Sequence, residues 1–204
     1  MSQDIRQDIQ SIIFSRRSIR RYQDRPIPRE VLEAVLTAAT WAPSAHNRQP
    51  WRFAVVTSPD TRRSLAQAMG ARLRADLAAD HVPPEIIEKD ATRSFSRITG
   101  AAALILVCMT MADMDHYPDE RRSSAEHLMA AQSTALAAQN LLLAAHDAGL
   151  GACWMCAPLF CPDVVSDQLD LPADWEPQAL LTLGYPAEQK QSTRQPLETR
   201  VVWR

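Results

Sequence analysis

The sequence predicts an α+β fold that is rich in helix, with a few strands spread along the chain. Apolar residues recur at helical spacing over several long segments, and short β-rich runs lie between them. The longest periodic segment, residues 123–148, is apolar around most of its circumference, so we expect it to be buried on several sides. A chain of 204 residues is long enough for one domain with a well-buried core and short for two. We therefore expect a single domain over residues 1–204.

The helices follow from the spacing of apolar residues. The first is predicted at the amino end, where the apolar positions are Ile5, Ile9, Ile12 and Ile13. A second is predicted over residues 29–42, because it starts after Pro28 and stops at Pro43. Further helices are predicted over residues 60–79, 123–148 and 162–169. Residues 80–96 are polar, contain two adjacent prolines and are mildly helical, which predicts a mobile cover over a ligand.

Four short apolar runs predict the strands, over residues 52–57, 101–109, 152–155 and 177–185. The segment Pro-Ser-Ala-His-Asn-Arg-Gln-Pro at residues 43–50 then becomes the loop between a helix and a strand. Loops of this kind are a usual place for ligand contacts. Residues 189–204 form a polar tail.

Composition narrows the possible functions. The net charge is −2 and the pI is about 6.2, so no global basic field favours nucleic acid. The first ten residues contain no secretory signal, and the apolar runs are too short or too interrupted to cross a bilayer. We therefore expect a cytoplasmic protein with no membrane and no nucleic-acid partner. Its four cysteines are expected to be free thiols.

Several common motifs are missing from the sequence. None of the five glycines forms Gly-x-Gly-x-x-Gly or a Walker phosphate loop, so a bound nucleotide is not held by a Rossmann turn. Cys153 and Cys156, with Cys161 nearby, lack a second ligand pair at metal-binding spacing, and we predict no metal site. No Gly-x-Ser-x-Gly elbow or paired carboxylate indicates hydrolysis.

The stretch Phe14–Tyr22, with the sequence Phe-Ser-Arg-Arg-Ser-Ile-Arg-Arg-Tyr, indicates an anion site. Guanidinium groups match the geometry of phosphate, and a serine hydroxyl adds a neutral hydrogen bond. The residues that could share one phosphate are Arg16, Arg17, Ser18 and Arg20. On charge alone, a solvated basic loop is the favoured interpretation, and the segments that follow support the anion site.

Three further segments follow this stretch along the chain: Trp41–Trp51, Gly149–Phe160 and Gly184–Pro186. Together, over roughly residues 14–200, they resemble the nitroreductase family of flavin mononucleotide (FMN) oxidoreductases. The resemblance implies a central, mainly antiparallel sheet surrounded by helices, in an intertwined homodimer with two sites at its interface. The long apolar helix also favours a dimer.

The resemblance also implies roles for individual residues. Arg16, Arg17 and Ser18 would contact the FMN phosphate, and Arg20 would reach the pyrimidine edge of the ring. Arg194 resembles the arginine that completes the phosphate site, with an untethered tail residue as the alternative. The partner subunit would contribute the segment that holds Pro43, Ser44, Ala45 and Asn47, whereas His46 is expected at the surface. The backbone of Cys156, Ala157 and Leu159 would lie against the ring, although Pro158 departs from the family pattern and removes one N–H donor.

These features predict an FMN-dependent oxidoreductase that takes a hydride from NADH or NADPH and reduces a small molecule: a nitroaromatic, a quinone, an enone or a cofactor precursor. No side chain is assigned as catalytic, because the flavin carries the chemistry. A flavin- or deazaflavin-binding protein without turnover is the alternative. Residues 161–165 and 171–177 resemble the family's deazaflavin-coenzyme reductase domain, but that domain is normally fused to a glutamate ligase, for which this chain has no room.

Overall fold

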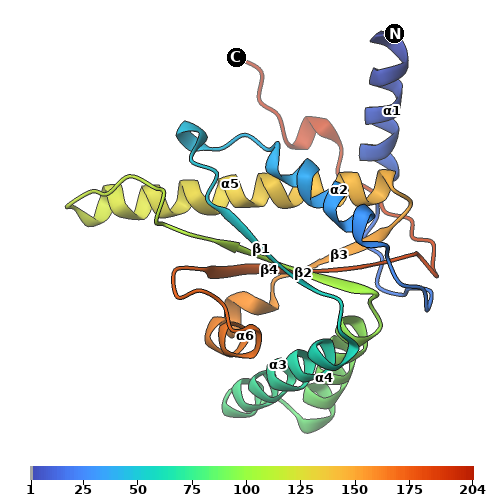
Figure 1. Cartoon of the computed structure of the whole chain (residues 1–204), viewed down its shortest axis with the longest axis vertical. Coiled ribbons are helices and arrows are strands. Elements are labelled where there is room, and N and C mark those ends of the chain that lie inside the picture. Colours follow the sequence, from blue (N-terminus) through green and yellow to red (C-terminus); the bar gives the residue numbers. More distant parts are fainter. Residues whose placement is uncertain (1) are drawn as a thin grey trace.

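The computed structural model describes residues 2–204, with side chains described from residue 9 onward, so Ile5 of the predicted apolar stripe lies outside the described side chains. A four-stranded sheet forms the middle layer, and helices cover both of its faces (Figure 1). The strands are β1 (Trp51–Val56), β2 (Ala103–Met109), β3 (Gly151–Met155) and β4 (Glu176–Gly184). Their order is β1-β2-β4-β3 and all neighbours are antiparallel, which confirms the α+β prediction.

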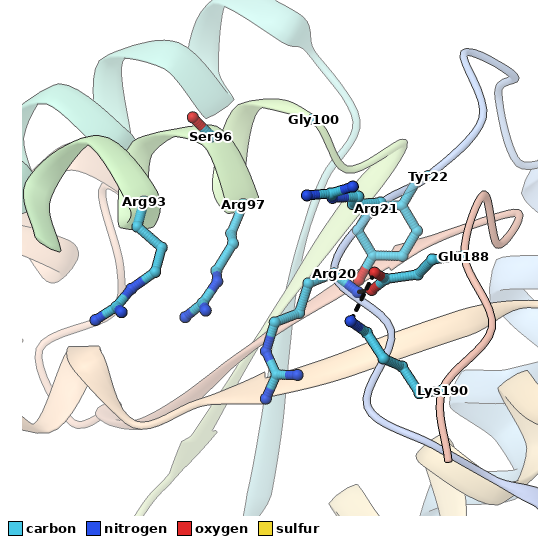
Figure 2. A pocket seen from close by; sticks show the side chains of 9 residues that line it. All are labelled: Arg20, Arg21, Tyr22, Arg93, Ser96, Arg97, Gly100, Glu188 and Lys190. Atoms are coloured by element: carbon cyan, nitrogen blue, oxygen red, sulfur yellow. Dashed lines mark hydrogen bonds and ion pairs between the residues drawn. The ribbon is translucent and has the colours of Figure 1, made fainter. Parts of the chain in front are cut away.

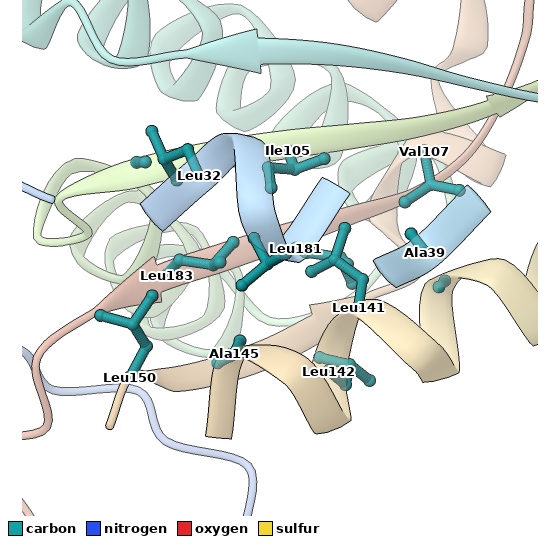
Figure 3. Packing of buried hydrophobic residues seen from close by; sticks show 14 of the residues in the cluster. Leu32, Ala39, Ile105, Val107, Leu141, Leu142, Ala145, Leu150, Leu181 and Leu183 are labelled. Carbon is teal, nitrogen blue, oxygen red and sulfur yellow. The ribbon is translucent and has the colours of Figure 1, made fainter. Parts of the chain in front are cut away.

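One face of the sheet is covered by α2 (Arg29–Thr40) and α5 (Glu120–Asp147). Alternate residues of the central strands point to this side, because successive side chains in a strand face opposite ways. Ile105 and Leu181 lie in one buried cluster with Leu32 of α2 and Leu141 of α5 (Figure 3). Within one chain the long helix is therefore buried only on the side that faces the sheet and α2, whereas Leu128 and Leu136 on its other side are exposed.

The opposite face is covered by α3 (Pro59–Ala79), α4 (Pro84–Thr99) and α6 (Pro162–Leu169). Leu104 and Leu106 point to this side and share a buried cluster with Leu65, Ile98 and Val165 of the three helices. All seven residues of β2 are buried because both faces of the strand are covered. This explains its unbroken apolar sequence.

The segment predicted as a mobile cover is a regular helix. Pro83 takes the N-cap position of α4 and Pro84 its first turn, where a missing N–H removes no helical hydrogen bond. Ile87, Ala91 and Ile98 are buried, and the helix packs along α3. The structure therefore places a packed helix where the sequence predicted a mobile segment. The apolar stripe of this helix is narrow and lies among many charged residues, so the sequence pattern indicates the helix only weakly.

The remaining elements lie around this three-layer core: α1 (Ser2–Ser15) and the short helices η1 (Ala45–Asn47), η2 (Ala157–Phe160) and η3 (Leu197–Thr199). α1 projects away from the sheet (Figure 1). Helix α5 begins three residues before the predicted start, because the Asp119 carboxylate accepts a hydrogen bond from the Arg122 N–H at 3.0 Å and caps it. Within residues 2–204, no helix is both long and apolar enough to cross a membrane.

Candidate functional site

The arginine stretch lies against the sheet beside β3. Ser18 forms an isolated parallel bridge with Ala152, and the Ile19 N–H donates to the Ala152 carbonyl at 3.0 Å. Further along, Tyr22 bridges to Pro186, next to the end of β4. The stretch is thus held by main-chain hydrogen bonds at both ends, so its arginine side chains are not needed to attach it to the sheet.

Two glycines allow this close approach. A Cβ on Gly151 would lie 2.7 Å from the Cβ of Ile19, and a Cβ on Gly184 would lie 2.7 Å from the Cγ of Tyr22. Ile19 is buried over the first glycine, and the Tyr22 ring lies over the second. The stretch can therefore lie flat on the sheet only because these two strand positions have no side chain.

The Tyr22 hydroxyl adds a polar anchor at the same place. It donates to the Ile19 carbonyl at 2.6 Å and lies 2.7 Å from the Thr182 Oγ1. Burial raises the pKa of Tyr22 well above its usual range, partly offset by the hydrogen bond with Thr182. The phenol therefore stays neutral and remains a donor at physiological pH.

The first of two adjoining cavities, which we call the arginine cavity, has a volume of about 260 Å³. Two segments far apart in the sequence enclose it, one at each end of the chain. Its lining residues are Arg16, Arg17, Ser18, Arg20, Lys190, Gln191, Ser192 and Arg194. The structure thus brings together all five predicted phosphate-site and pyrimidine-edge residues, and none of the residues that line the arginine cavity is acidic.

Within this cavity, the Arg17 guanidinium is turned toward the end of α1. Its Nη1 donates to the carbonyls of Phe14 at 2.6 Å and Arg16 at 2.9 Å, while its Nε is buried without a partner among the described residues. Arg17 therefore caps the helix end in addition to lining the cavity. This capping role was not predicted from the sequence.

The second cavity, which we call the α4 cavity, has a volume of about 500 Å³ and shares Arg20 and Lys190 with the first. Figure 2 shows Arg93 and Arg97 of α4 on one side of this space, with Glu188 and Lys190 on the other. Sequence reasoning missed these four residues. The four-residue spacing of Arg93 and Arg97, which sets them on one helix face, was the available signal.

Glu188 holds the backbone of Arg20 and the side chain of Lys190, the two residues shared by both cavities. Its carboxylate accepts a hydrogen bond from the Arg20 N–H at 2.8 Å and lies 3.1 Å from the Lys190 Nζ. Burial would raise the pKa of Glu188, but these hydrogen bonds outweigh it and hold the pKa below its usual value. The carboxylate is therefore ionised and positions the backbone of Arg20, while the Arg20 side chain remains in the cavity.

The loop predicted to reach a flavin lies outside both cavities. The Ala45 N–H donates to the Ser133 Oγ of α5 at 3.2 Å, which ties the loop to the long helix. His46, Asn47 and Gln49 all have positive φ, at 50°, 54° and 52°. Non-glycine residues rarely adopt this conformation, and it concentrates at ligand-binding sites. Within one chain, the structure does not bring Pro43, Ser44, Ala45 or Asn47 to the arginine cavity.

The η2 segment also lies outside the two cavities. Cys156 and Leu159 are exposed and Pro158 is buried, while Ala157 lines a separate small cavity of about 90 Å³ next to α3. Cys153, in β3, is buried near Arg20. Burial raises the pKa of its thiol, and the charges of Arg20 and Arg97 oppose that rise. The four cysteines are free thiols, as predicted.

Comparison with known proteins gives the family. A family model described as the nitroreductase family matches residues 13–185. An NADH dehydrogenase of Thermus thermophilus is 34% identical, over 97% of this chain and 96% of that protein. A crystal structure of a protein assigned as a nitroreductase, from Desulfovibrio desulfuricans and in complex with FMN, is 28% identical, with a TM-score of 0.73 over 96% of both chains. A BluB-like flavoprotein from Clostridium difficile, 22% identical, shares the fold with a TM-score of 0.80 over 96% of this chain and 98% of that one.

The fold and the site define an α+β protein with a cationic cavity where its arginine stretch meets the sheet. More narrowly, the chain belongs to the nitroreductase family, and this confirms the resemblance seen in the sequence.

Proposed function

We propose that this protein is an FMN-dependent oxidoreductase that uses NADH or NADPH to reduce a small organic acceptor, such as a nitroaromatic, a quinone, an enone or a cofactor precursor. The observation that carries the proposal is the arginine cavity. It gathers five cationic side chains and no carboxylate in a chain whose net charge is −2. The names of the relatives, an NADH dehydrogenase and an NAD(P)H nitroreductase of Methanothermobacter thermautotrophicus that is 32% identical, support a nicotinamide donor.

The residues present suit FMN. A phosphate monoester carries about two negative charges near neutral pH, and guanidinium groups bind it with charge-assisted hydrogen bonds. In this proposal Arg16, Ser18 and Arg194 hold the phosphate, and Arg20, which lines both cavities, lies near the ring. FMN, when bound, would accept a hydride from the nicotinamide and pass electrons to the acceptor. A fixed guanidinium beside the ring favours the reduced, more negative flavin.

We further propose that two chains build each site. The 43–47 loop lies away from the cavities of its own chain, yet it has the strained backbone of a binding loop. Large apolar side chains are exposed on α1, on α5 and near the carboxyl end: Ile9, Ile13, Phe14, Leu128, Leu136, Leu197, Val202 and Trp203. A surface of this kind is typical of an interface. Light scattering on the FMN-loaded protein tests the dimer, and a monomer that binds FMN tightly would contradict it.

Cofactor binding is tested by the visible spectrum of the purified protein and by FMN titration in a calorimeter. Arg16→Gln removes a charged donor from the arginine cavity, so we expect FMN affinity to fall about ten- to a hundredfold, as for the loss of one hydrogen bond to a charged group. Arg29→Gln is the control, because Arg29 is exposed on α2 and pairs with Glu33. A colourless protein that takes up no FMN would refute the proposal.

Turnover separates an enzyme from a flavin carrier. We expect steady oxidation of NADH or NADPH that depends on added menadione or a nitroarene. An FMN-loaded protein without acceptor-dependent turnover across a broad panel would favour the carrier.

A further inference from the structure

The two adjoining cavities together hold more positive charge than one phosphate group requires. Eight cationic side chains and one carboxylate line the two adjoining cavities: Arg16, Arg17, Arg20, Arg21, Arg93, Arg97, Lys190, Arg194 and Glu188. The whole chain has a net charge of −2, so the remainder is strongly acidic. One FMN phosphate would neutralise about two of these charges. A second anionic group can therefore be accommodated.

Arg93 and Arg97 are the charges that the phosphate site does not use. Both come from α4, line only the larger cavity and lie on the same side of it (Figure 2). The side chain of Arg97 is half-buried and makes no hydrogen bond or ion pair with the described part of the chain. Burial lowers the pKa of Arg97, and the neighbouring charges of Arg20 and Arg93 lower it further. An anion in the cavity would remove this repulsion.

Arg93 is available to such an anion. Its Nη2 lies 2.6 Å from the Asp90 Oδ1, but the arginine and aspartate side chains are 53% and 35% exposed. Exposed ion pairs of this kind contribute about 0–1 kcal/mol, so the pair can be exchanged for a ligand at little cost. Arg93 can therefore turn from Asp90 to a ligand with a loss of fold stability of at most about 1 kcal/mol.

We propose that Arg93, assisted by Arg97, forms an anion subsite for the substrate that reacts at the bound flavin. The inference rests on the proposed function and adds the class of substrate: a molecule with a carboxylate or phosphate group. Two sources have this chemistry, a carboxylated electron acceptor and the 2′-phosphate of NADPH.

Equilibrium binding to the oxidised, FMN-loaded protein tests the subsite without turnover. Two matched ligand pairs differ by one anionic group: 4-nitrobenzoate against 4-nitrobenzamide, and NADP⁺ against NAD⁺. The change in the visible flavin spectrum, or the heat in a calorimeter, reports each Kd. Arg93→Gln is compared with Arg122→Gln, because Arg122 also pairs with an aspartate three residues away and is 50% exposed, but lies on α5. Flavin content and thermal unfolding are measured for every variant.

We expect the wild type to prefer the anionic member of at least one pair, and Arg93→Gln to weaken that member about tenfold, the equivalent of ~1.4 kcal/mol. The Kd of the neutral member should be unchanged in Arg93→Gln, and the Kd values of both members should be unchanged in Arg122→Gln. The pair that responds identifies the source of the anion. Equal wild-type affinities within both pairs, or equal weakening of both members by Arg93→Gln, would overturn this inference alone. A protein that binds no FMN would overturn the proposed function as well.

Discussion

The contact between Gly151 and Ile19 provides a direct test of how the arginine stretch is held. In Gly151→Ala the new Cβ would lie 2.7 Å from the Cβ of Ile19, 2.8 Å from its Cγ2 and 3.0 Å from its Cγ1. Contacts this short cannot persist, and the Cβ of Ile19 cannot rotate away because it is attached to the backbone. The stretch must therefore move off β3. Overpacking of this kind costs about 1–3 kcal/mol, and we expect ~2 kcal/mol here.

Denaturant unfolding and calorimetry measure this effect. For a domain of this size, ~2 kcal/mol corresponds to a fall in Tm of about 4–8 °C. Gly70→Ala is the matched control: Gly70 is also buried, but its added Cβ would meet only the end of the flexible Arg74 side chain, at 3.3 Å. An alanine inside a helix should raise stability by about 0.5–1 kcal/mol. A Gly151→Ala protein within about 0.5 kcal/mol of the wild type would refute the close-contact reasoning.

Two further predictions concern the Tyr22 anchor and the proposed dimer. Burial raises the pKa of Tyr22 above that of the unfolded chain, so its contribution to the free energy of unfolding is complete below about pH 10 and declines above it. Tyr22→Phe should lower the free energy of unfolding by about 1 kcal/mol at pH 7. In urea unfolding, the difference in this free energy between the variant and the wild type should shrink above pH 10. A difference that stays constant with pH, or an equal pH dependence in the control Tyr117→Phe, would contradict this role. Leu136→Glu places a charge on the exposed face of α5, where Leu136 is 47% exposed. We expect light scattering to show a monomer and titration to show weaker FMN binding, whereas the control Glu30→Gln on α2 should leave the assembly unchanged. A dimeric Leu136→Glu protein would argue against α5 in the interface.

The sequence predicted the fold well where the periodic signal was strong. The unbroken apolar run of β2 is explained by burial on both faces of the sheet. The apolar residues of α5 that face the sheet are buried as expected, but those on its other side are exposed in the single chain. Several element ends were displaced by one to three residues, because they depend on local hydrogen bonds such as the Asp119 cap. Residues 80–96 were expected to be a mobile segment, but the structure shows a packed helix there, because tertiary packing of Ile87, Ala91 and Ile98 decides its conformation.

The site was only partly predictable. A short motif located Arg16, Ser18 and Arg20, because several donors in adjacent positions are a local signal. The approach of Lys190 and of Arg97 is a tertiary event, since it depends on where the carboxyl-terminal tail and α4 lie relative to the arginine stretch. No local pattern reports such distances. The position of the 43–47 loop in a dimer likewise depends on contacts between two chains, which no local pattern in one sequence specifies.

The anchoring of the arginine stretch explains how so much like charge can be concentrated. Ion pairs to hold the arginines would have neutralised them, yet the stretch is fixed by main-chain hydrogen bonds, by Ile19 over Gly151 and by Tyr22 over Gly184. The nearby carboxylate, Glu188, accepts from the backbone of Arg20 and pairs with Lys190, so the guanidinium of Arg20 keeps its charge. The repulsion among these groups lowers the stability of the free protein, and an anionic ligand that binds only the folded state reverses that loss. The scaffold therefore holds the arginines with neutral contacts and leaves their charge for the ligand.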